Sequence, residues 1–214
     1  MIVNIVGGGP AELLPDLRQY DQENCVWVGV DRGVSILLEK GIIPALGFGD
    51  FDSVSEDEWR EIERKVKGLK KFLPEKDEPD MELALNWGIE QGASEIRIFG
   101  GTGGRLDHFL ANVQLLLKPI IQASQTVVMI VDQKNQLFLK QEGIHPIHRM
   151  PKKKYISFIP ITNVENLSLI GFKYPLTNRH IPLGSTLCIS NELNKDSGTF
   201  SFTKGILLVI RSCD

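Results

Sequence analysis

The stretch EIRIFGGTGGRLDHFLANVQLLL, residues 95–117, decides the fold of this chain. Its first residues alternate polar and apolar side chains as in a strand, whereas apolar residues from Leu106 onward recur at helical spacing. Four glycines between positions 100 and 104 join the two patterns. A strand that enters a helix through a glycine turn is typical of α/β sheets, and such a turn presents backbone N–H groups to phosphate oxygens.

Further units of this kind lie between residue 1 and about residue 131. Their strand-like apolar runs are Ile2–Val6, Cys25–Val30, Pro44–Phe48, Leu69–Leu73 and Thr126–Val131. Helical patterns separate most of these runs, and strands connected by helices run parallel in one sheet. We therefore predict that residues 1–140 form an α/β domain, an N-terminal parallel sheet flanked by helices in a Rossmann-like arrangement.

The hydrophobic period changes after about residue 140. Short β-type runs separated by Gly, Pro and Asn replace the helical patterns: Tyr155–Ile161, Leu167–Phe172, Thr186–Ser190, Thr199–Phe202 and Ile206–Ile210. The predicted fold class is therefore α/β plus all-β, with residues 141–214 forming a C-terminal antiparallel β-sandwich.

The composition argues against several classes of function. A net charge of −3 over 214 residues disfavours a broad nucleic-acid-binding surface. No apolar run approaches the length that spans a membrane, and the N-terminus lacks the basic segment of a signal peptide. The three cysteines lie far apart without zinc-binding spacing, so we expect a cytoplasmic protein without structural disulfides.

Acidic residues follow the second, third and fourth predicted strands. They occur in Asp31-Arg32, Asp50-Phe51-Asp52 and Asp77-Glu78-Pro79-Asp80. Ligands of open α/β sheets bind at the carboxyl ends of the strands, so these residues should converge with the glycine loop. Clustered carboxylates repel one another unless a cation lies between them, and hard divalent cations prefer oxygen ligands. Together the clusters predict a magnesium–nucleotide site.

Each cluster alone allows a simpler interpretation. An Asp-x-Asp pair after a strand is common in turns with Asx hydrogen bonds, and Asp77 could be a helix N-cap. The glycines of residues 100–104 could be present only because the backbone adopts positive φ angles there, without any ligand. Arg105 is different, because a cation is unfavourable at a helix N-terminus and therefore calls for an anionic partner such as phosphate.

Taken in order, Asp31, the acidic clusters at 49–53 and 76–80, the loop Gly-Gly-Thr-Gly-Gly-Arg-Leu-Asp-His at 100–108 and an all-β tail resemble the thiamine pyrophosphokinase family. The resemblance covers nearly the whole chain. It implies an α/β domain followed by a β-sandwich, and a homodimer with active sites between subunits. It also implies that the β,γ-pyrophosphoryl group of ATP is transferred to the thiamine hydroxyl, which gives thiamine diphosphate and AMP.

The resemblance assigns roles to individual residues. The implied Mg²⁺ ligands are Asp50, Asp52 and Asp77, with Asp80 in the same cluster. The implied ATP-binding residues are Asp31, Gly101, Thr102, Gly103, Gly104 and Arg105. Arg32 departs from the small residue that the family often has after the strand-two Asp, and we expect it to add a phosphate contact to the ATP-binding set. The implied catalytic residues are Asp50, Asp52, Asp77, Arg105 and Asp107, of which the last would orient the reacting alcohol or a metal-bound water. Ser190 and Asn191 are the implied thiamine-binding pair, whereas the aromatic residue expected to stack on thiamine is not assigned.

Two alternative functions fit parts of the sequence. The run Asp50-Phe51-Asp52-Ser53-Val54 matches the nucleophile pattern of haloacid-dehalogenase-like phosphatases, with Asp50 as covalent nucleophile. That motif, however, follows the third predicted strand instead of the first, and the glycine loop has no role in that reaction. A non-catalytic nucleotide-binding regulatory module would use the glycine loop but would not need four clustered carboxylates.

Overall fold

The computed structural model describes residues 1–50, 55–67, 69–71 and 78–214. The chain divides into two compact units, Met1–Gln133 and Lys134–Asp214. In the described ranges, no helix is long and apolar enough to cross a membrane.

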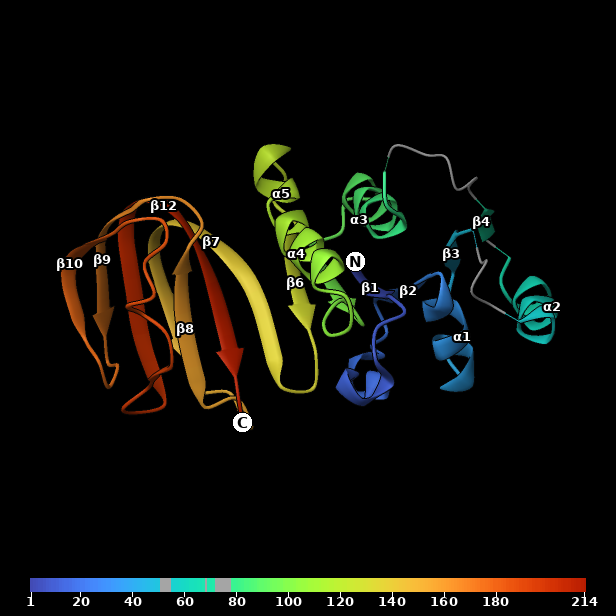
Figure 1. The fold of residues 1–214 in the computed structure, drawn as a ribbon, viewed down its shortest axis with the longest axis horizontal. Coiled ribbons are helices and arrows are strands. Elements are labelled where there is room, and N and C mark those ends of the chain that lie inside the picture. The colour runs from blue at the N-terminus through green and yellow to red at the C-terminus, as the bar shows by residue number, and fades with distance from the viewer. Residues whose placement is uncertain (51–54, 68, 72–77) are drawn as a thin grey trace. The chain divides into compact units, whose positions relative to one another are not determined.

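The first unit is built on a parallel sheet with the strand order β6-β5-β1-β2-β3-β4 (Figure 1). All five neighbouring pairs in this order are parallel. The strands are β1 Ile2–Val6, β2 Cys25–Val30, β3 Leu46–Gly49, β4 Leu69–Lys71, β5 Glu95–Phe99 and β6 Val127–Val131. The helices are α1 Arg32–Glu39, α2 Glu56–Lys65, α3 Asp80–Glu90, α4 Leu106–Leu115 and α5 Lys118–Ile121, with 3-10 turns η1 Ala11–Leu13 and η2 Leu17–Tyr20.

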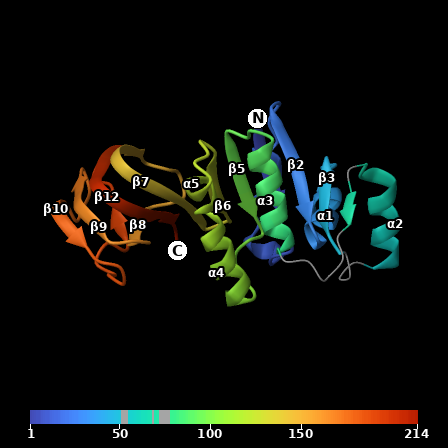
Figure 2. The same ribbon diagram turned by 90° about the horizontal axis from the view of Figure 1, so that it is seen from above.

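Helices cover both faces of this sheet (Figure 2). Successive residues of a strand point to opposite faces, so each strand can supply apolar side chains to two layers. Val6 of β1 and Phe99 of β5 pack with Leu37 of α1 on one face. On the other face, Val3 and Ile96 lie against α3, where the absence of a side chain at Gly88 permits close packing. Burial on both faces explains why these strands read as nearly continuous apolar runs.

The order of the strands places a topological switch point between β1 and β5. From β1 the chain adds β2, β3 and β4 on one side and then returns to add β5 and β6 on the other. In open parallel sheets, ligands bind at the carboxyl ends of the strands on either side of such a point. The loops after β1 and β5 are therefore where a ligand site is expected.

The second unit consists of antiparallel strands organised around β12, Ser197–Ser212. One edge of β12 pairs along its whole length with β7, Asn135–His148. Its other edge pairs first with β9, Val164–Ile170, and then with β8, Tyr155–Pro160. The remaining strands are β10 Leu176–Ile181, which pairs with β9, and β11 Asn191–Glu192, which pairs with β8.

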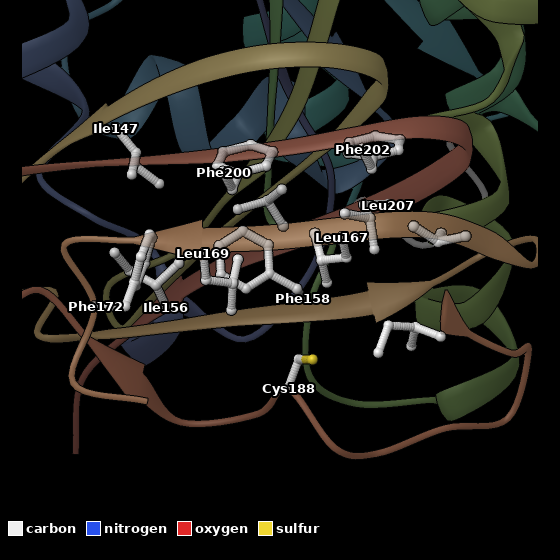
Figure 3. Packing of buried hydrophobic residues seen from close by; sticks show 13 residues of the cluster. Ile147, Ile156, Phe158, Leu167, Leu169, Phe172, Cys188, Phe200, Phe202 and Leu207 are labelled. Carbon is white, nitrogen blue, oxygen red and sulfur yellow. The ribbon is translucent and has the colours of Figure 1, made fainter. Parts of the chain in front are cut away.

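Apolar side chains from these strands meet in one core (Figure 3). Phe158 of β8 contacts Phe200 of β12, with ring centroids 4.9 Å apart, and meets Phe172 edge-to-face at 5.6 Å. All three rings are almost completely buried. Strand β8, which pairs with the second half of β12, is thus joined by side-chain packing to the first half of β12 and to Phe172, which follows β9.

The structure confirms the predicted mixed class, a sheet with helices followed by antiparallel strands. Some predictions for the second half were wrong. Residues 186–190 form turns and coil, and the short strand β11 follows them at Asn191. The runs at 199–202 and 206–210 belong to the single strand β12, whose register shifts between Phe202 and Ile206 around Gly205, which has a φ of 110°. Strands β7 and β10 had not been predicted, because both carry many exposed polar residues and lack a continuous apolar pattern.

Gly33 lets α1 begin directly against the end of β1. A Cβ added at Gly33 would overlap the carbonyl oxygen of Val6. We predict that Gly33→Ala lowers the free energy of unfolding of the first unit by about 1–3 kcal/mol, because the helix must move to relieve the overlap. Urea unfolding followed by tryptophan fluorescence measures this, since Trp27, Trp59 and Trp87 all belong to this unit.

The matched control is Ser35→Ala in the same helix. Ser35 is buried, and its hydroxyl finds no hydrogen-bond partner among the described residues. Removing it should therefore change the free energy of unfolding by less than about 1 kcal/mol. Equal unfolding midpoints for Gly33→Ala and wild type would show that the packing of α1 does not depend on this glycine.

Candidate active site

The loops after β1 and β5 lie backbone against backbone at the switch point. The N–H of Gly7 donates to the carbonyl oxygen of Phe99 at 2.8 Å, and the N–H of Gly9 donates to the carbonyl oxygen of Gly100 at 3.1 Å. A Cβ on Gly9 would lie 2.5 Å from the Gly100 oxygen, so a larger residue would force the loops apart.

The glycine loop, Gly100–Gly104, leads directly to the N-terminus of α4. Gly100, Gly103 and Gly104 have φ angles of 65°, 78° and 63°, in the left-handed region that favours glycine. Gly103 and Gly104 are exposed, and among the described residues their N–H groups have no backbone acceptor. Because the N-terminus of a helix also favours negative charge, these N–H groups are suited to an anionic ligand.

The inner part of the glycine loop is fastened to the body of the unit by two side chains. The hydroxyl of Thr102 donates to Oδ2 of Asp132 at 2.8 Å, and both residues are buried. The amide Nδ2 of Asn112 on α4 donates to the carbonyl oxygen of Gly101 at 2.9 Å. The Thr102 side chain is therefore directed into the protein, and the part of the loop that faces solvent is backbone.

Arg105 and Asp107 form a doubly hydrogen-bonded ion pair at the start of α4. The Nε of Arg105 donates to Oδ1 of Asp107 at 3.1 Å, and its Nη2 donates to Oδ2. Both side chains are mostly exposed. The Arg105 guanidinium holds the pKa of Asp107 below its usual range, chiefly by hydrogen bonding, and Asp107 raises the pKa of Arg105. Within the chain, Arg105 thus has an anionic partner in Asp107, and the phosphate contact predicted for it stays a prediction.

Asp31 and Asp50 follow the neighbouring strands β2 and β3. The N–H of Asp31 donates to the carbonyl oxygen of Phe48 at 2.8 Å, which joins the ends of these strands. A Cβ on Gly49 would overlap the Asp31 carboxylate, so this carboxylate lies against Gly49, the residue before Asp50. Both aspartates are half-buried. The structure therefore brings these two oxygen donors to one edge of the sheet.

Arg32 connects this region to the loop after β1. Arg32 is the exposed first residue of α1, and a Cβ added at Gly8 would lie 3.2 Å from the Cβ of Arg32.

Asp80, which is half-buried, is the first residue of α3. The N-cap of α3 is Pro79, and Asp77, for which an N-cap was the simpler interpretation, lies outside the described residues.

The structure leaves the predicted Mg²⁺ site untested. Asp52 and Asp77, two of the four predicted ligands, lie outside the described residues. Within the ranges that the structure describes, no three His, Cys, Asp or Glu side chains are grouped to hold a metal ion. The carboxylates of Asp31 and Asp50 have the oxygen chemistry that Mg²⁺ prefers, and the Mg²⁺ site stays a prediction.

In the second unit, the predicted thiamine-binding pair is tied to its surroundings. The N–H of Ser190, whose φ is 54°, donates to Oγ of Ser157 at 2.9 Å. Asn191 is only 2% exposed. Its Oδ1 accepts the N–H of Tyr174 at 3.0 Å, and its Nδ2 donates to the Tyr174 carbonyl at 2.8 Å. The amide of Asn191 therefore fixes the backbone of an aromatic residue that is 58% exposed.

Sequence reasoning had not identified Asp132, Asn112 or Tyr174. Asp132 directly follows β6, so the strand-end pattern that singled out Asp31 and Asp50 also applies to it. Asn112 lies on α4 within the helical pattern and carries no separate signal. The contact of Tyr174 with Asn191 joins residues 17 apart in the chain and is visible only in the structure.

Two family models match the chain and together cover most of it. The model described as "Thiamin pyrophosphokinase, catalytic domain" matches residues 17–130, within the first unit. The model described as "Thiamin pyrophosphokinase, vitamin B1 binding domain" matches residues 143–207, within the second.

Individual relatives agree with these matches. A thiamine pyrophosphokinase of Bacillus subtilis (strain 168) is 50% identical over 213 residues, which is 99% of each chain. The crystal structure of a thiamin pyrophosphokinase from Geobacillus thermodenitrificans is 52% identical, with a TM-score of 0.91 over 100% of this chain and 98% of that one. The yeast thiamin pyrophosphokinase structure shares the fold, with a TM-score of 0.79 at 14% identity over 99% of this chain and 86% of that one.

The ion pair at the start of α4 leads to a prediction about titration. In Arg105→Met, the pKa of Asp107 should rise towards the ordinary carboxyl range, because the hydrogen bonds that stabilise the ionised form are lost. In wild type, Asp107 should lose its charge only when the pH falls below that range. A pH titration of the ¹³C signal of the Asp107 carboxyl group measures both values.

Arg60→Met is the control for this titration. Arg60 pairs with Glu56 and Asp57 on α2, so its removal deletes a surface cation without touching α4. The titration of Asp107 should then match that of wild type. An unchanged Asp107 pKa in Arg105→Met would show that the ion pair does not persist in solution.

Proposed function

The chain belongs to the thiamin pyrophosphokinase family and has thiamine pyrophosphokinase activity, and we propose that the reaction takes place at the carboxyl ends of the parallel strands, between ATP and thiamine. The observation that carries this assignment is a continuous series of contacts along that edge. The glycine loop touches the loop after β1, Gly8 of that loop lies beside Arg32, and Asp31 lies against Gly49 beside Asp50. Phosphate-binding donors and carboxylates are thus brought together in the first unit.

In this proposal the glycine loop binds the ATP phosphates through its backbone. The N–H groups of Gly103 and Gly104 precede α4 and face solvent, and Arg105 adds a planar guanidinium suited to two phosphate oxygens. Gly101 and Thr102 support the loop from inside. Asp31 and Arg32, at the start of α1, complete the ATP-binding set.

Asp50, Asp52, Asp77 and Asp80 are the proposed Mg²⁺ ligands. Of the described members, Asp50 directly follows β3 and Asp80 is the first residue of α3, and both have the carboxylate oxygens that a hard cation prefers. Bound Mg²⁺ supplies charge neutralisation at the phosphates.

The reaction requires one bond to form and one to break at the β-phosphorus. The thiamine hydroxyl oxygen bonds to this phosphorus, the bond to the α–β bridging oxygen breaks, AMP leaves, and the hydroxyl proton is released. Arg105 and the loop N–H groups would stabilise the negative charge that develops on the phosphate oxygens. Asp107 would orient the hydroxyl as a hydrogen-bond acceptor, and strong general-base help is not needed when the transition state is loose.

The second unit is the proposed thiamine-binding domain. Ser190 and Asn191 belong to it, and Asn191 holds Tyr174 with an exposed ring. An aromatic ring suits both the flat pyrimidine and the cationic thiazolium of thiamine. Tyr174 is therefore our candidate for the stacking residue, with Asn191 as the residue that positions it.

The finer description of the architecture is also a proposal. We describe residues 1–140 as a Rossmann-like catalytic domain and residues 141–214 as a β-sandwich. The parallel order β6-β5-β1-β2-β3-β4 supports the first term. The packing of Phe158 of β8, which pairs with the second half of β12, against Phe200 in the first half of β12 supports the second.

Assembly and location follow from the same proposal. The enzyme would act as a homodimer, with each site built by two subunits. It would act in the cytoplasm, because the free thiols of Cys25, Cys188 and Cys213 fit a reducing compartment. Mixing Asp50→Asn and Asn191→Ala protomers should then restore part of the activity. No recovery after verified subunit exchange would show that each chain builds its site alone.

The nucleotide product tests the reaction. Incubation with ATP, Mg²⁺ and thiamine should give AMP and thiamine diphosphate in equal amounts, because the β,γ-pyrophosphoryl group moves as one unit. Chromatographic separation of AMP, ADP and phosphate measures this. Formation of ADP would indicate an ordinary kinase, and phosphate release without thiamine diphosphate would favour the phosphatase that uses Asp50 as nucleophile.

Asp50→Asn should lower turnover by about a hundredfold, because a carboxylate proposed to hold the metal is lost. Asp57→Asn is the control, since Asp57 is an exposed acid on α2 that pairs with Arg60. Its turnover should match wild type. Wild-type turnover of Asp50→Asn across a range of Mg²⁺ concentrations would remove Asp50 from the metal-ligand set.

Asn191→Ala should raise the KM for thiamine by about tenfold and leave the KM for ATP nearly unchanged, because it frees the backbone of Tyr174. Asn194→Ala is the matched control, since Asn194 also donates to a backbone carbonyl nearby, that of Phe172, at 3.0 Å. A loss of stability with an unchanged thiamine KM in Asn191→Ala would make this residue purely structural.

A further inference from the structure

Thr102 is the one residue with a side chain between Phe99 and Arg105. That side chain is 7% exposed, and its hydroxyl donates at 2.8 Å to Oδ2 of Asp132, which is 3% exposed. The bond joins the loop after β5 to the residue that follows β6, the neighbouring strand. The glycine loop thus uses its single side chain for an internal contact, and its remaining polar groups are those of the backbone.

The backbone of such a loop must be restrained by contacts with the rest of the protein if its N–H groups are to keep one orientation. Glycine loses more conformational freedom on ordering than any other residue, and Gly100, Gly103 and Gly104 surround Thr102. A ligand that met a disordered loop would have to order it on binding, which weakens affinity. The hydrogen bond to Asp132 fixes the side chain of Thr102 and therefore the peptide groups on either side of it.

The chain at Asp132 supports the same loop by a second route. The N–H of Gln133 donates to the carbonyl oxygen of Leu13 at 2.7 Å. The Cδ1 atom of Leu13 would lie 2.5 Å from a Cβ added at Gly103, so this side chain packs closely under the loop. Asp132 and Gln133 therefore hold both the inner side of the loop and the residue packed beneath it.

The contact has a direction that apolar packing would not provide. Two apolar side chains of similar shape could fill the same buried space with little change in stability. A hydroxyl bonded to a carboxylate instead fixes the orientation of both groups, and such bonds are short and strong. The arrangement suits a loop whose orientation matters more than its burial.

We propose that Asp132 and Thr102 are positioning residues for the nucleotide, which hold the glycine loop so that its N–H groups face the phosphates. The proposal rests on the assignment of the glycine loop to the ATP phosphates. Neither residue needs to touch the reacting atoms, because both act through the backbone of Gly103 and Gly104.

The test compares nucleotide binding with stability. The probe is α,β-methylene-ATP with Mg²⁺, measured by isothermal titration calorimetry on the full chain. The double variant Thr102→Val with Asp132→Leu replaces both partners by apolar groups, so it should keep a melting temperature close to wild type. Its dissociation constant should rise by about tenfold or more, whereas the KM for thiamine should stay within about twofold.

Two single variants sharpen the comparison. Thr102→Ser keeps the hydroxyl, so it should bind the probe within about threefold of wild type. Thr126→Val is the matched control. Thr126 is also buried, and its hydroxyl donates at 2.7 Å to the carbonyl oxygen of Ala93. It directly precedes β6, whereas Asp132 directly follows this strand, so the control lies at the end of β6 away from the glycine loop. It should lose stability without losing affinity for the probe.

The outcomes separate this inference from the assignment on which it rests. In wild type, the probe should shift the amide NMR signals of Gly101, Gly103 and Gly104. Unshifted signals would reject the assignment of the loop to the phosphates. Shifted signals together with wild-type affinity in the double variant would overturn the positioning role alone. If the double variant does not fold, Thr102→Val decides: it keeps the shape of the side chain but removes the hydroxyl donor, and an affinity for the probe equal to wild type would overturn the positioning role.

Discussion

The close approach of two backbones at the switch point is the constraint on which the candidate site depends. The loops after β1 and β5 can donate and accept hydrogen bonds across this point only because Gly7, Gly9 and Gly100 carry no side chains. Glycines permit close contacts at two further positions along this edge, where Gly33 lies against β1 and Gly49 lies against Asp31. Each glycine brings one more loop within reach, so charged groups from distant parts of the sequence come to one edge of the sheet.

That edge holds charges of both signs, and they are partly paired before any ligand binds. Arg105 and Asp107 neutralise each other at the start of α4. A phosphate that engages the guanidinium must compete with Asp107, whose pKa is lowered chiefly by the hydrogen bonds from Arg105. Release of the carboxylate from the pair removes this effect, so its pKa rises towards the ordinary carboxyl range. The two roles that we propose, phosphate binding by Arg105 and orientation of an alcohol by Asp107, are therefore linked through one ion pair.

Local patterns in the sequence were sufficient for much of this site and less so for the second unit. The glycine run and the strand-end residues Asp31 and Asp50 could be recognised because their signals lie within a few residues of a strand. The sequence analysis had predicted a phosphate as the partner of Arg105, whereas the structure shows an ion pair with Asp107, two residues away. Strand β10 escaped prediction because it is largely exposed and polar. Asn191 had been predicted as a thiamine-binding residue, which the structure does not test, and its hydrogen bonds to Tyr174 depend on how β11 packs against a loop distant in the sequence.

Three polar side chains that are buried or half-buried share one property, which changes how motif residues are interpreted. Thr102, Asn112 and Asn191 each direct a hydroxyl or amide towards another part of the chain, and two of the three hold a backbone group. A buried polar group without such a partner would be costly, so its hydrogen bonds are largely used within the protein. In the proposed site, ligand contacts are left to exposed groups: the N–H groups of the glycine loop, the Arg105 guanidinium and the Tyr174 ring. A residue can therefore belong to a family motif because it orients the group that binds, without itself touching the ligand.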